Sequence, residues 1–317
     1  MKAIKIAGYP FVRILIFLLK YKKTSGIFNF VYERLPYRAV RYIVDKIEQP
    51  KFSFIWKILL DNGKIIKTKV DKDDIKTWQF ALSYKWQDPL LNVIENKTEQ
   101  FYRNKNLLWI DVGSNLGLRS LIPLSKGKSV LFVEPNKELN TINNERCRMN
   151  LFSDYTIFNC GVGEKDDELE IYIDKSSYLS SFDKTISQGF ELQRVEKVAV
   201  KTLDSIFYGL NRGFDSLYIK IDTEGFEEKV LLGSKKIITE YKPDFVIEIN
   251  EKGNHFNSII NQMKDSGYRV FELPESNLNM KRIIDITSLQ SFNDYTFKGN
   301  NFLFTTNDKL INFLKLT

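Results

Sequence analysis

The stretch Asp111-Val112-Gly113-Ser114-Asn115-Leu116-Gly117 decides the fold of this chain. It follows the apolar run 107–110 and opens a stretch with helix-like spacing. A carboxylate at a strand end, followed by glycines in a tight turn, lets the backbone of an α/β sheet approach a nucleoside cofactor. Glu134 ends the next apolar run, 130–133, where a carboxylate can accept hydrogen bonds from both hydroxyls of a ribose. The two segments together predict a cofactor site at neighbouring strand ends.

Two nucleoside cofactors compete for this site. A dinucleotide-binding turn has the spacing G-x-G-x-x-G, and the second and third glycines of that pattern are missing from the segment 113–118. S-adenosylmethionine has no pyrophosphate, so its site needs less exposed backbone, and Asp111 before the first glycine suits its amino-acid end. The spacing to Glu134 fits both cofactors. The residues favour S-adenosylmethionine, with a plain strand–turn–helix junction as the alternative.

Apolar runs alternate with helix-like stretches from residue 107 onward. This alternation is typical of an α/β fold in which helices cover both faces of a parallel sheet. Residues 169–173 and 195–200 are predicted to be inserted strands, and 301–305 is predicted to be the final strand. The predicted strands of the sheet are 107–112, 129–133, 154–159, 216–221, 244–249 and 268–273, with helices near 115–125, 136–149, 226–239 and 255–266.

A second group of polar residues follows the later strands. The run 216–221 ends at Asp222-Thr223-Glu224-Gly225-Phe226-Glu227, and the run 243–250 carries Glu248 and Asn250 at its end. Because the carboxyl ends of parallel strands meet at one edge of a sheet, these side chains are expected beside the cofactor turn.

The order of these motifs resembles the FkbM family of S-adenosylmethionine-dependent methyltransferases. The resemblance implies a Rossmann-like class I methyltransferase sheet, mostly parallel with an antiparallel last strand, and S-adenosyl-L-methionine as cofactor. Phe226 departs from the family pattern, which often has a small residue there, and is expected to narrow the pocket. The segment 221–227 is the most specific match. The resembling stretches are 110–117, 133–136, 202–204, 220–227, 232–234 and 243–248.

Cofactor-binding residues are expected at three strand ends. Asp111 is expected to orient the methionine amino group, and Glu134 to hold the ribose. Asn159 and Cys160 are placed to flank the adenine, with a turn cap as the alternative for Asn159 and core packing for Cys160. The predicted cofactor residues are Asp111, Gly113, Ser114, Asn115, Gly117, Glu134, Asn159, Cys160 and Gly161.

The catalytic candidates are Asp222, Glu224, Glu248 and His255, the one histidine of the chain. An alcohol acceptor must lose its proton during methyl transfer, so a base near the methyl group is expected. Glu224 has the alternative of capping the helix after it, and His255 that of a surface or capping residue. Because one histidine and two cysteines cannot form a conventional zinc site, no metal is predicted, although the strand-end oxygens leave Mg²⁺ as an alternative.

The positive charge is concentrated at the N-terminus. Residues 1–50 hold ten basic and three acidic side chains, so this segment carries the whole net charge of +7 and the remainder is neutral. The pI therefore gives little support for nucleic-acid binding. The apolar run 11–19 is too short to span a bilayer. A basic amphipathic helix on an anionic membrane, through residues 1–25, competes with a helix that packs on the domain or on a partner chain.

The sequence thus predicts two parts. Residues 1–105 form an appendage with a hairpin around 61–63 and helices over 73–105, which caps the active site or forms a homodimer; residues 106–317 form the methyltransferase domain. The resemblance to the FkbM family implies O-methylation of a hydroxyl group, and a sugar or glycan is the expected acceptor. The alternatives are methylation of a secondary metabolite at oxygen or nitrogen, and a non-catalytic binding module. Two cysteines suggest a reducing compartment, so the expected location is the cytoplasm or the inner face of the membrane.

Overall fold

The computed structural model divides the chain into two compact units. The first comprises Met1–Gln87 with Arg146–Leu151, and the second Asp88–Glu145 with Phe152–Thr317. Residues 88–105, expected in the appendage, belong to the second unit because helix α5 (Pro89–Phe101) packs against α6 (Leu121–Ser125) and α12 (Asp308–Leu316). The described residues are 14, 17–19, 21–36, 39–40, 43–60, 62–84, 88–174, 180–184, 186–189, 191–250, 254–274, 283–289 and 295–316.

The first unit is built on an antiparallel hairpin of β1 (Phe54–Leu59) and β2 (Ile65–Val70). The predicted hairpin is confirmed, with Gly63 at a φ of +81° in its turn, whereas Asp61 lies outside the described residues. Trp56 of β1 is fully buried among aromatic rings from the two helices α2 (Lys22–Tyr32) and α4 (Ile75–Ser83). Among the described residues, no helix has the length and apolarity needed to cross a bilayer.

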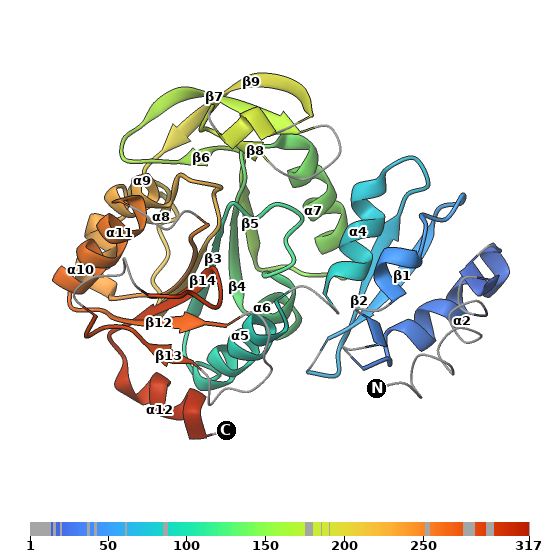
Figure 1. Cartoon of the computed structure of the whole chain (residues 1–317), viewed down its shortest axis with the longest axis horizontal. Helices are drawn as coiled ribbons and strands as arrows, with labels where there is room; N and C mark the ends of the chain where they lie inside the picture. Colours follow the sequence, from blue (N-terminus) through green and yellow to red (C-terminus); the bar gives the residue numbers. More distant parts are fainter. Residues whose placement is uncertain are drawn as a thin grey trace. The chain divides into compact units, whose positions relative to one another are not determined.

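The second unit contains an eight-stranded sheet (Figure 1). The five strands β5-β4-β3-β10-β11 are parallel, and β14 runs antiparallel between β11 and β12. The predicted mostly parallel α/β fold with an antiparallel last strand is therefore confirmed. The sheet runs in the order β13 (Ile284–Asp285), β12 (Arg269–Leu273), β14 (Asn301–Thr305), β11 (Asp244–Glu248), β10 (Ser216–Ile221), β3 (Leu107–Val112), β4 (Ser129–Val133) and β5 (Tyr155–Phe158).

The two faces of this sheet have different surroundings. Alternate residues of β3 and β10, such as Ile110 and Ile219, join one apolar cluster with four helices: α8 (Leu203–Gly209), α9 (Glu227–Leu232), α10 (Lys235–Tyr241) and α11 (Asn254–Asp265). The intervening residues face the opposite side, where Trp109 stacks on Tyr218 and Asp111 lies opposite Lys220 in the strand pairing. This opposite face therefore brings buried charges close to the strand ends.

Two helix predictions needed correction. The expected helix 115–125 is wrong over its first part, because Asn115 and Gly117 have positive φ angles and α6 begins only at Leu121. The expected helix 226–239 is two helices, α9 and α10, separated at Gly233, where an added Cβ would lie 2.0 Å from the carbonyl oxygen of Gly163. The helix α7 (Lys137–Met149) was predicted within one residue.

The inserted strands form a second, four-stranded sheet beyond one end of the central strands (Figure 1). Its long hairpin, β7 (Asp167–Asp174) with β9 (Leu192–Lys201), is antiparallel and extends the two predicted inserted strands at both ends. The short strands β6 (Gly161–Val162) and β8 (Ser180–Ser181) complete it. Because β6 directly follows β5, the chain enters this sheet from the predicted cofactor edge.

Candidate active site

A cavity that is open to solvent lies at the carboxyl ends of β3, β4 and β10. Both predicted motifs contribute to it, so the structure brings the glycine turn and the Asp222 loop together. The lining residues are Val112, Gly113, Asn115, Val133, Glu134, Pro135, Cys160, Gly161, Val162, Ile171, Ser180, Phe182, Asp222, Thr223 and Glu224.

The glycine turn needs glycine at both of its expected positions. Gly113 has a φ of +72°, and a Cβ added there would lie 1.8 Å from the carbonyl oxygen of Asp222. Gly117 has a φ of +69°, and its added Cβ would meet Asn143 and Phe132 at 2.8 Å. The first glycine therefore permits close contact between β3 and β10, and the second permits contact with α7.

Glu134 occupies the centre of the site. Its carboxylate is buried and accepts one backbone hydrogen bond on each oxygen, from Asn115 N to Oε2 and from Asn136 N to Oε1, both at 2.9 Å. Each oxygen keeps a second lone pair, which is the arrangement needed to accept two ribose hydroxyls. Burial raises the pKa of Glu134 to about 7, while the two backbone donors act in the opposite direction.

The remaining predicted turn residues take different positions. Asn115 lines the cavity, and its Oδ1 is buried without a hydrogen-bond partner in the described part of the chain, as is the Oγ of Ser114. The Asn115 oxygen, on a residue that lines the cavity, is therefore available to bind a polar ligand. Asp111 does not line the cavity; its carboxylate accepts a 2.7 Å hydrogen bond from Ser120 Oγ, and burial raises its pKa to about 6. Its contact with the methionine amino group stays a prediction.

The opposite end of the cavity is apolar. Cys160 and Gly161 line it, whereas the amide of Asn159 donates a 2.7 Å hydrogen bond to the carbonyl of Pro135, as in the turn-cap alternative. Cys160 also belongs to the apolar core, so the two alternatives for this residue are not exclusive. An apolar wall beside a polar turn fits the adenine and the ribose of one nucleoside.

The second sheet contributes residues that the sequence did not predict. Ile171 and Phe182 line the apolar end, and a Cβ added to Gly161 would lie 2.5 Å from the Phe182 ring. Phe182 packs against Phe226, with the rings tilted and their centroids 5.0 Å apart, so the bulky Phe226 supports this wall and is not itself among the lining residues. No spacing in the sequence relates 182 to 226, because the contact depends on the path of the inserted hairpin.

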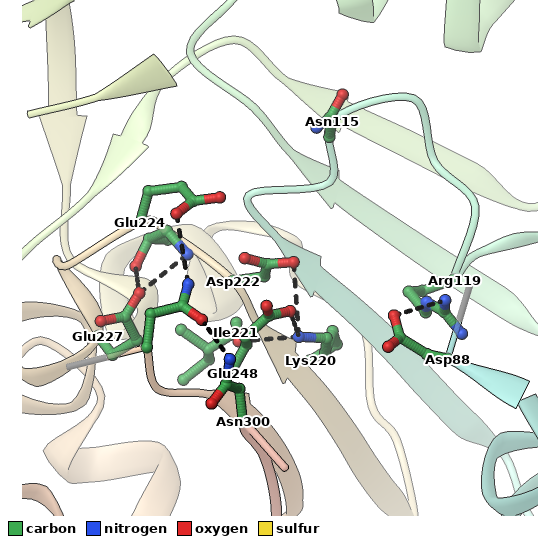
Figure 2. A network of polar contacts seen from close by, with 12 residues as sticks. Asp88, Asn115, Arg119, Lys220, Ile221, Asp222, Glu224, Glu227, Glu248 and Asn300 are labelled. Carbon is green, nitrogen blue, oxygen red and sulfur yellow. Dashed lines mark hydrogen bonds and ion pairs between the residues drawn. The ribbon is translucent and has the colours of Figure 1, made fainter. Parts of the chain in front are cut away.

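Asp222 and Glu248 lie at the ends of β10 and β11 with Lys220 between them (Figure 2). The Lys220 ammonium is 3.7 Å from a carboxylate oxygen of each and donates a 3.2 Å hydrogen bond to the carbonyl of Ile221. Burial opposes the charge of Lys220, but the two carboxylates raise its pKa above the usual value. The negative charge of Asp222, with burial, raises the pKa of Glu248 to about 8.

Lys220 belongs to a larger buried network of charges. Arg119 pairs with Asp88 at 3.3 Å and with Glu95 at 3.4 Å, and donates a 2.6 Å hydrogen bond to Asn92 (Figure 2 shows the Asp88 pair). The sequence does contain a sign of this network, because Lys220 is a charged residue inside an otherwise apolar predicted strand. The partners of Arg119 are contributed by α5 and the residue before it, far away in the sequence, and were not predictable from spacing.

The loop between Asp222 and α9 is held by Glu227. Its buried Oε1 accepts hydrogen bonds from Thr223 N at 3.1 Å, Thr223 Oγ1 at 3.0 Å and Gly225 N at 3.0 Å. Glu224 has a φ of +50° and lines the cavity, and α9 has no side-chain cap, so Glu224 does not cap that helix. Burial and the neighbouring Asp222 raise the pKa of Glu224 to about 7.

The metal alternative has little support in this geometry. The Asn250 amide donates to Glu224 Oε2 at 3.4 Å, and its own oxygen accepts a 2.9 Å hydrogen bond from Asn300. Lys220 already holds the position between Asp222 and Glu248. Over the described ranges, no three His, Cys, Asp or Glu side chains are grouped to hold a metal ion.

His255 lies on α11 and pairs with two acids of α9. Its Nε2 is 3.3 Å from Glu227 Oε2, and its Nδ1 is 3.4 Å from Glu228 Oε2. These contacts, the Glu227 hydrogen bond first, raise the pKa of His255. The structure therefore brings His255 to the helix that follows the Asp222 loop and not to the cavity lining, which corresponds to the capping alternative.

The ionisation of Glu134 predicts a pH dependence of cofactor binding. Ribose hydroxyls donate to the ionised carboxylate, and Glu134 takes up a proton as pH falls through about 7. The affinity for S-adenosylhomocysteine should therefore weaken below that pH, approaching about tenfold per pH unit. Calorimetry across pH measures it, and Glu134→Gln should flatten the curve. If the affinity of Glu134→Gln still depends on pH, the titrating group is Glu224. If the affinity of the wild type does not depend on pH, the assignment of Glu134 as the ribose-binding carboxylate is contradicted.

Comparison with known proteins identifies the family. The Methyltransferase FkbM domain matches residues 106–270. Solved structures with similar folds include the methyltransferase FkbM from Methylobacillus flagellatus KT (20% identity, TM-score 0.39, 62% of this chain and 42% of that one) and the METTL16 methyltransferase domain (11%, 0.42, 80% and 87%). Another is the Pyrococcus abyssi tRNA (uracil-54, C5)-methyltransferase in complex with S-adenosyl-L-homocysteine (11%, 0.34, 68% and 38%). The chain thus spans less than half the length of the Methylobacillus protein.

No curated protein sequence matches the chain significantly. The matched family region contains the glycine turn, Glu134, and the carboxylates at the ends of β10 and β11. The unpartnered Asn115 oxygen and the glycine at 113 fit a polar nucleoside ligand at this turn. Because the match covers more than half of the sequence and includes both strand-end motifs, the protein belongs to the FkbM family of methyltransferases, with S-adenosyl-L-methionine as its cofactor.

Proposed function

We propose that the enzyme methylates a hydroxyl group of a sugar or glycan, such as a capsule, O-antigen or other cell-surface polysaccharide precursor. The observation that carries the proposal is the pair of carboxylates, Asp222 and Glu248, held on Lys220 at the strand ends beside the cofactor cavity. Carboxylates accept hydrogen bonds from neutral hydroxyls, and one of them can take the proton that an alcohol loses.

The cofactor supplies an electrophilic methyl group on a sulfonium, so the protein contributes position and electrostatics. Asp222 is the carboxylate of the pair that lines the cavity, and we assign it the proton of the acceptor hydroxyl. Glu248, whose pKa is raised to about 8, holds its own proton at neutral pH. Lys220 stays charged and fixes both carboxyl groups.

The charges around the site favour a neutral acceptor. Asp222, Glu224 and Glu248 lie at the strand ends, and Asp88 also acts electrostatically on Glu248. The two cations of the network, Lys220 and Arg119, are already paired with carboxylates. A sugar with free hydroxyls next to the methylation site is therefore a better partner than one with a phosphate or carboxylate at that position.

The first experiment is calorimetric titration of the purified chain with S-adenosylmethionine and S-adenosylhomocysteine. We expect micromolar binding that is lost in Glu134→Ala, because the ribose hydroxyls lose their acceptors. A labelled methyl donor then tests a panel of neutral sugars, uronic acids, sugar phosphates and amines in parallel.

Each outcome of the panel decides the proposal. Transfer to a neutral sugar hydroxyl, stable to alkaline hydrolysis as an ether is, supports it. Transfer to an amine or to a non-sugar hydroxyl would show that the proposed acceptor class is wrong, although the protein is still a methyltransferase. Absence of cofactor binding by a folded wild-type protein would instead favour a non-catalytic glycan-binding or partner-binding module.

A further inference from the structure

Five large apolar side chains of the first unit are exposed close together in the sequence. Ile14, Phe17, Tyr21, Ile27 and Phe30 are each 53–58% exposed. Scattered exposed apolar residues are ordinary on a protein surface, but five large ones within seventeen residues of the chain are an unusual concentration. We call this set the N-terminal apolar surface.

Two of these residues are in direct contact, and two others share one side of a helix. The rings of Phe17 and Tyr21 are 5.5 Å apart, and Tyr21 is the extended residue that precedes α2. Ile27 and Phe30 are three residues apart on the exposed side of α2, away from the side that is buried through Phe28 and Tyr32.

The surface is held in place by contacts with the hairpin. Asn29 of α2 bonds the backbone of Lys57 in β1 twice, accepting from its N–H at 2.8 Å and donating to its carbonyl at 3.0 Å. Thr24 Oγ1 donates a 2.6 Å hydrogen bond to the carbonyl of Leu18, which joins the two helical stretches. The apolar side chains are therefore presented by a fixed scaffold.

The charges beside the apolar residues have one sign. Lys22, Lys23 and Arg34 are exposed, and the Arg34 guanidinium lies 3.6 Å from the centre of the Phe30 ring. Glu33 is the one acid between residues 14 and 36, and its carboxylate is buried, accepting 2.8 Å hydrogen bonds from Trp56 Nε1 and Leu59 N. The segment thus presents apolar and basic groups without a compensating exposed acid.

We infer that the N-terminal apolar surface binds the protein to an anionic lipid bilayer. Apolar side chains enter the boundary between headgroups and acyl chains, while lysine and arginine stay among the negative headgroups. Residues 1–50 carry the whole net charge of +7, which gives this part of the chain a long-range attraction to anionic lipid. The enzyme would then meet its acceptor at a membrane, which agrees with an acceptor carried on a lipid.

Vesicle flotation of the full-length protein tests this inference. We expect binding to vesicles of phosphatidylglycerol and phosphatidylcholine, weaker binding to phosphatidylcholine alone, and loss of binding as salt is raised. Phe30→Asp should lower partitioning of the protein into the vesicles about tenfold or more, because the aromatic ring that would enter the lipid is replaced by a charged group. The double change Lys22→Gln with Lys23→Gln should lower it about thirty-fold on anionic vesicles and leave the neutral-vesicle value unchanged.

Ile65→Asp is the matched control. Ile65 is also 53% exposed in the first unit, but it lies on β2, outside the N-terminal apolar surface, so this variant should bind vesicles as the wild type does. Equal binding of wild type and the lysine double variant would overturn the inference, since those exposed side chains are not needed for folding. So would a lipid-free dimer, seen by light scattering, that Phe30→Asp converts to a monomer, because a second copy would then cover the surface.

Discussion

Asp222→Asn should lower the rate of methyl transfer roughly 10²–10⁴-fold, the usual contribution of a positioned general base, whereas Glu248→Gln should keep most of the activity at pH 7. Glutamine has the shape and hydrogen-bonding capacity of a protonated glutamate. Since the pKa of Glu248 is raised to about 8, the wild-type side chain is protonated at neutral pH and the substitution changes little. Asparagine cannot take a proton from the acceptor hydroxyl.

The pH profile separates the roles of the two carboxyl groups. As pH rises through about 8, Glu248 loses its proton and becomes a second carboxylate at the strand ends that can accept the proton of the acceptor hydroxyl. The wild-type rate should therefore rise across that range, and Glu248→Gln should remove the rise. Rates are measured with the acceptor found in the panel, and S-adenosylhomocysteine affinity serves as the control for folding. Inactivity of Glu248→Gln with activity of Asp222→Asn would reverse the assignment.

The central sheet could be predicted because its strands are buried on both faces. Parallel strands covered by helices appear in the sequence as continuous apolar runs, and the runs at 107–112, 129–133 and 216–221 match the strands residue for residue. The carboxylates at their ends follow from chain direction alone, which is why Glu134 and Asp222 were correctly expected beside one another.

What remained unpredicted depends on tertiary contacts. The stretch 115–120 has helix-like spacing, but the hydrogen bonds of its backbone go elsewhere: Asn115 N donates to Glu134 and Asn115 O accepts from Asn143. The Phe182 wall depends on an inserted hairpin that returns to the cavity. Tyr295 and Phe297 pack against the core around Phe256, which no spacing in the sequence indicates.

Gly113→Ala is expected to have the largest effect on stability and on cofactor affinity together. A Cβ at this position would lie 1.8 Å from a backbone oxygen of Asp222, so the end of β10 must move away from β3. We expect a loss of about 1–2 kcal/mol from the left-handed backbone conformation and about 1–3 kcal/mol more from overpacking. Binding of S-adenosylhomocysteine should also be lost, because Asp222 and Thr223 line the cavity.

Gly127→Ala isolates the conformational part of this effect. Gly127 has a φ of +75°, close to the +72° of Gly113, but no atom lies within 4 Å of its added Cβ. Chemical denaturation should therefore show only the cost of about 1–2 kcal/mol for the backbone conformation, with cofactor affinity unchanged. The difference between the two variants measures how tightly β3 and β10 hold the cavity. Equal stability and equal binding of the two would mean that Asp222 is not fixed against the glycine turn, and the assignment of Asp222 as the base would lose its geometric support.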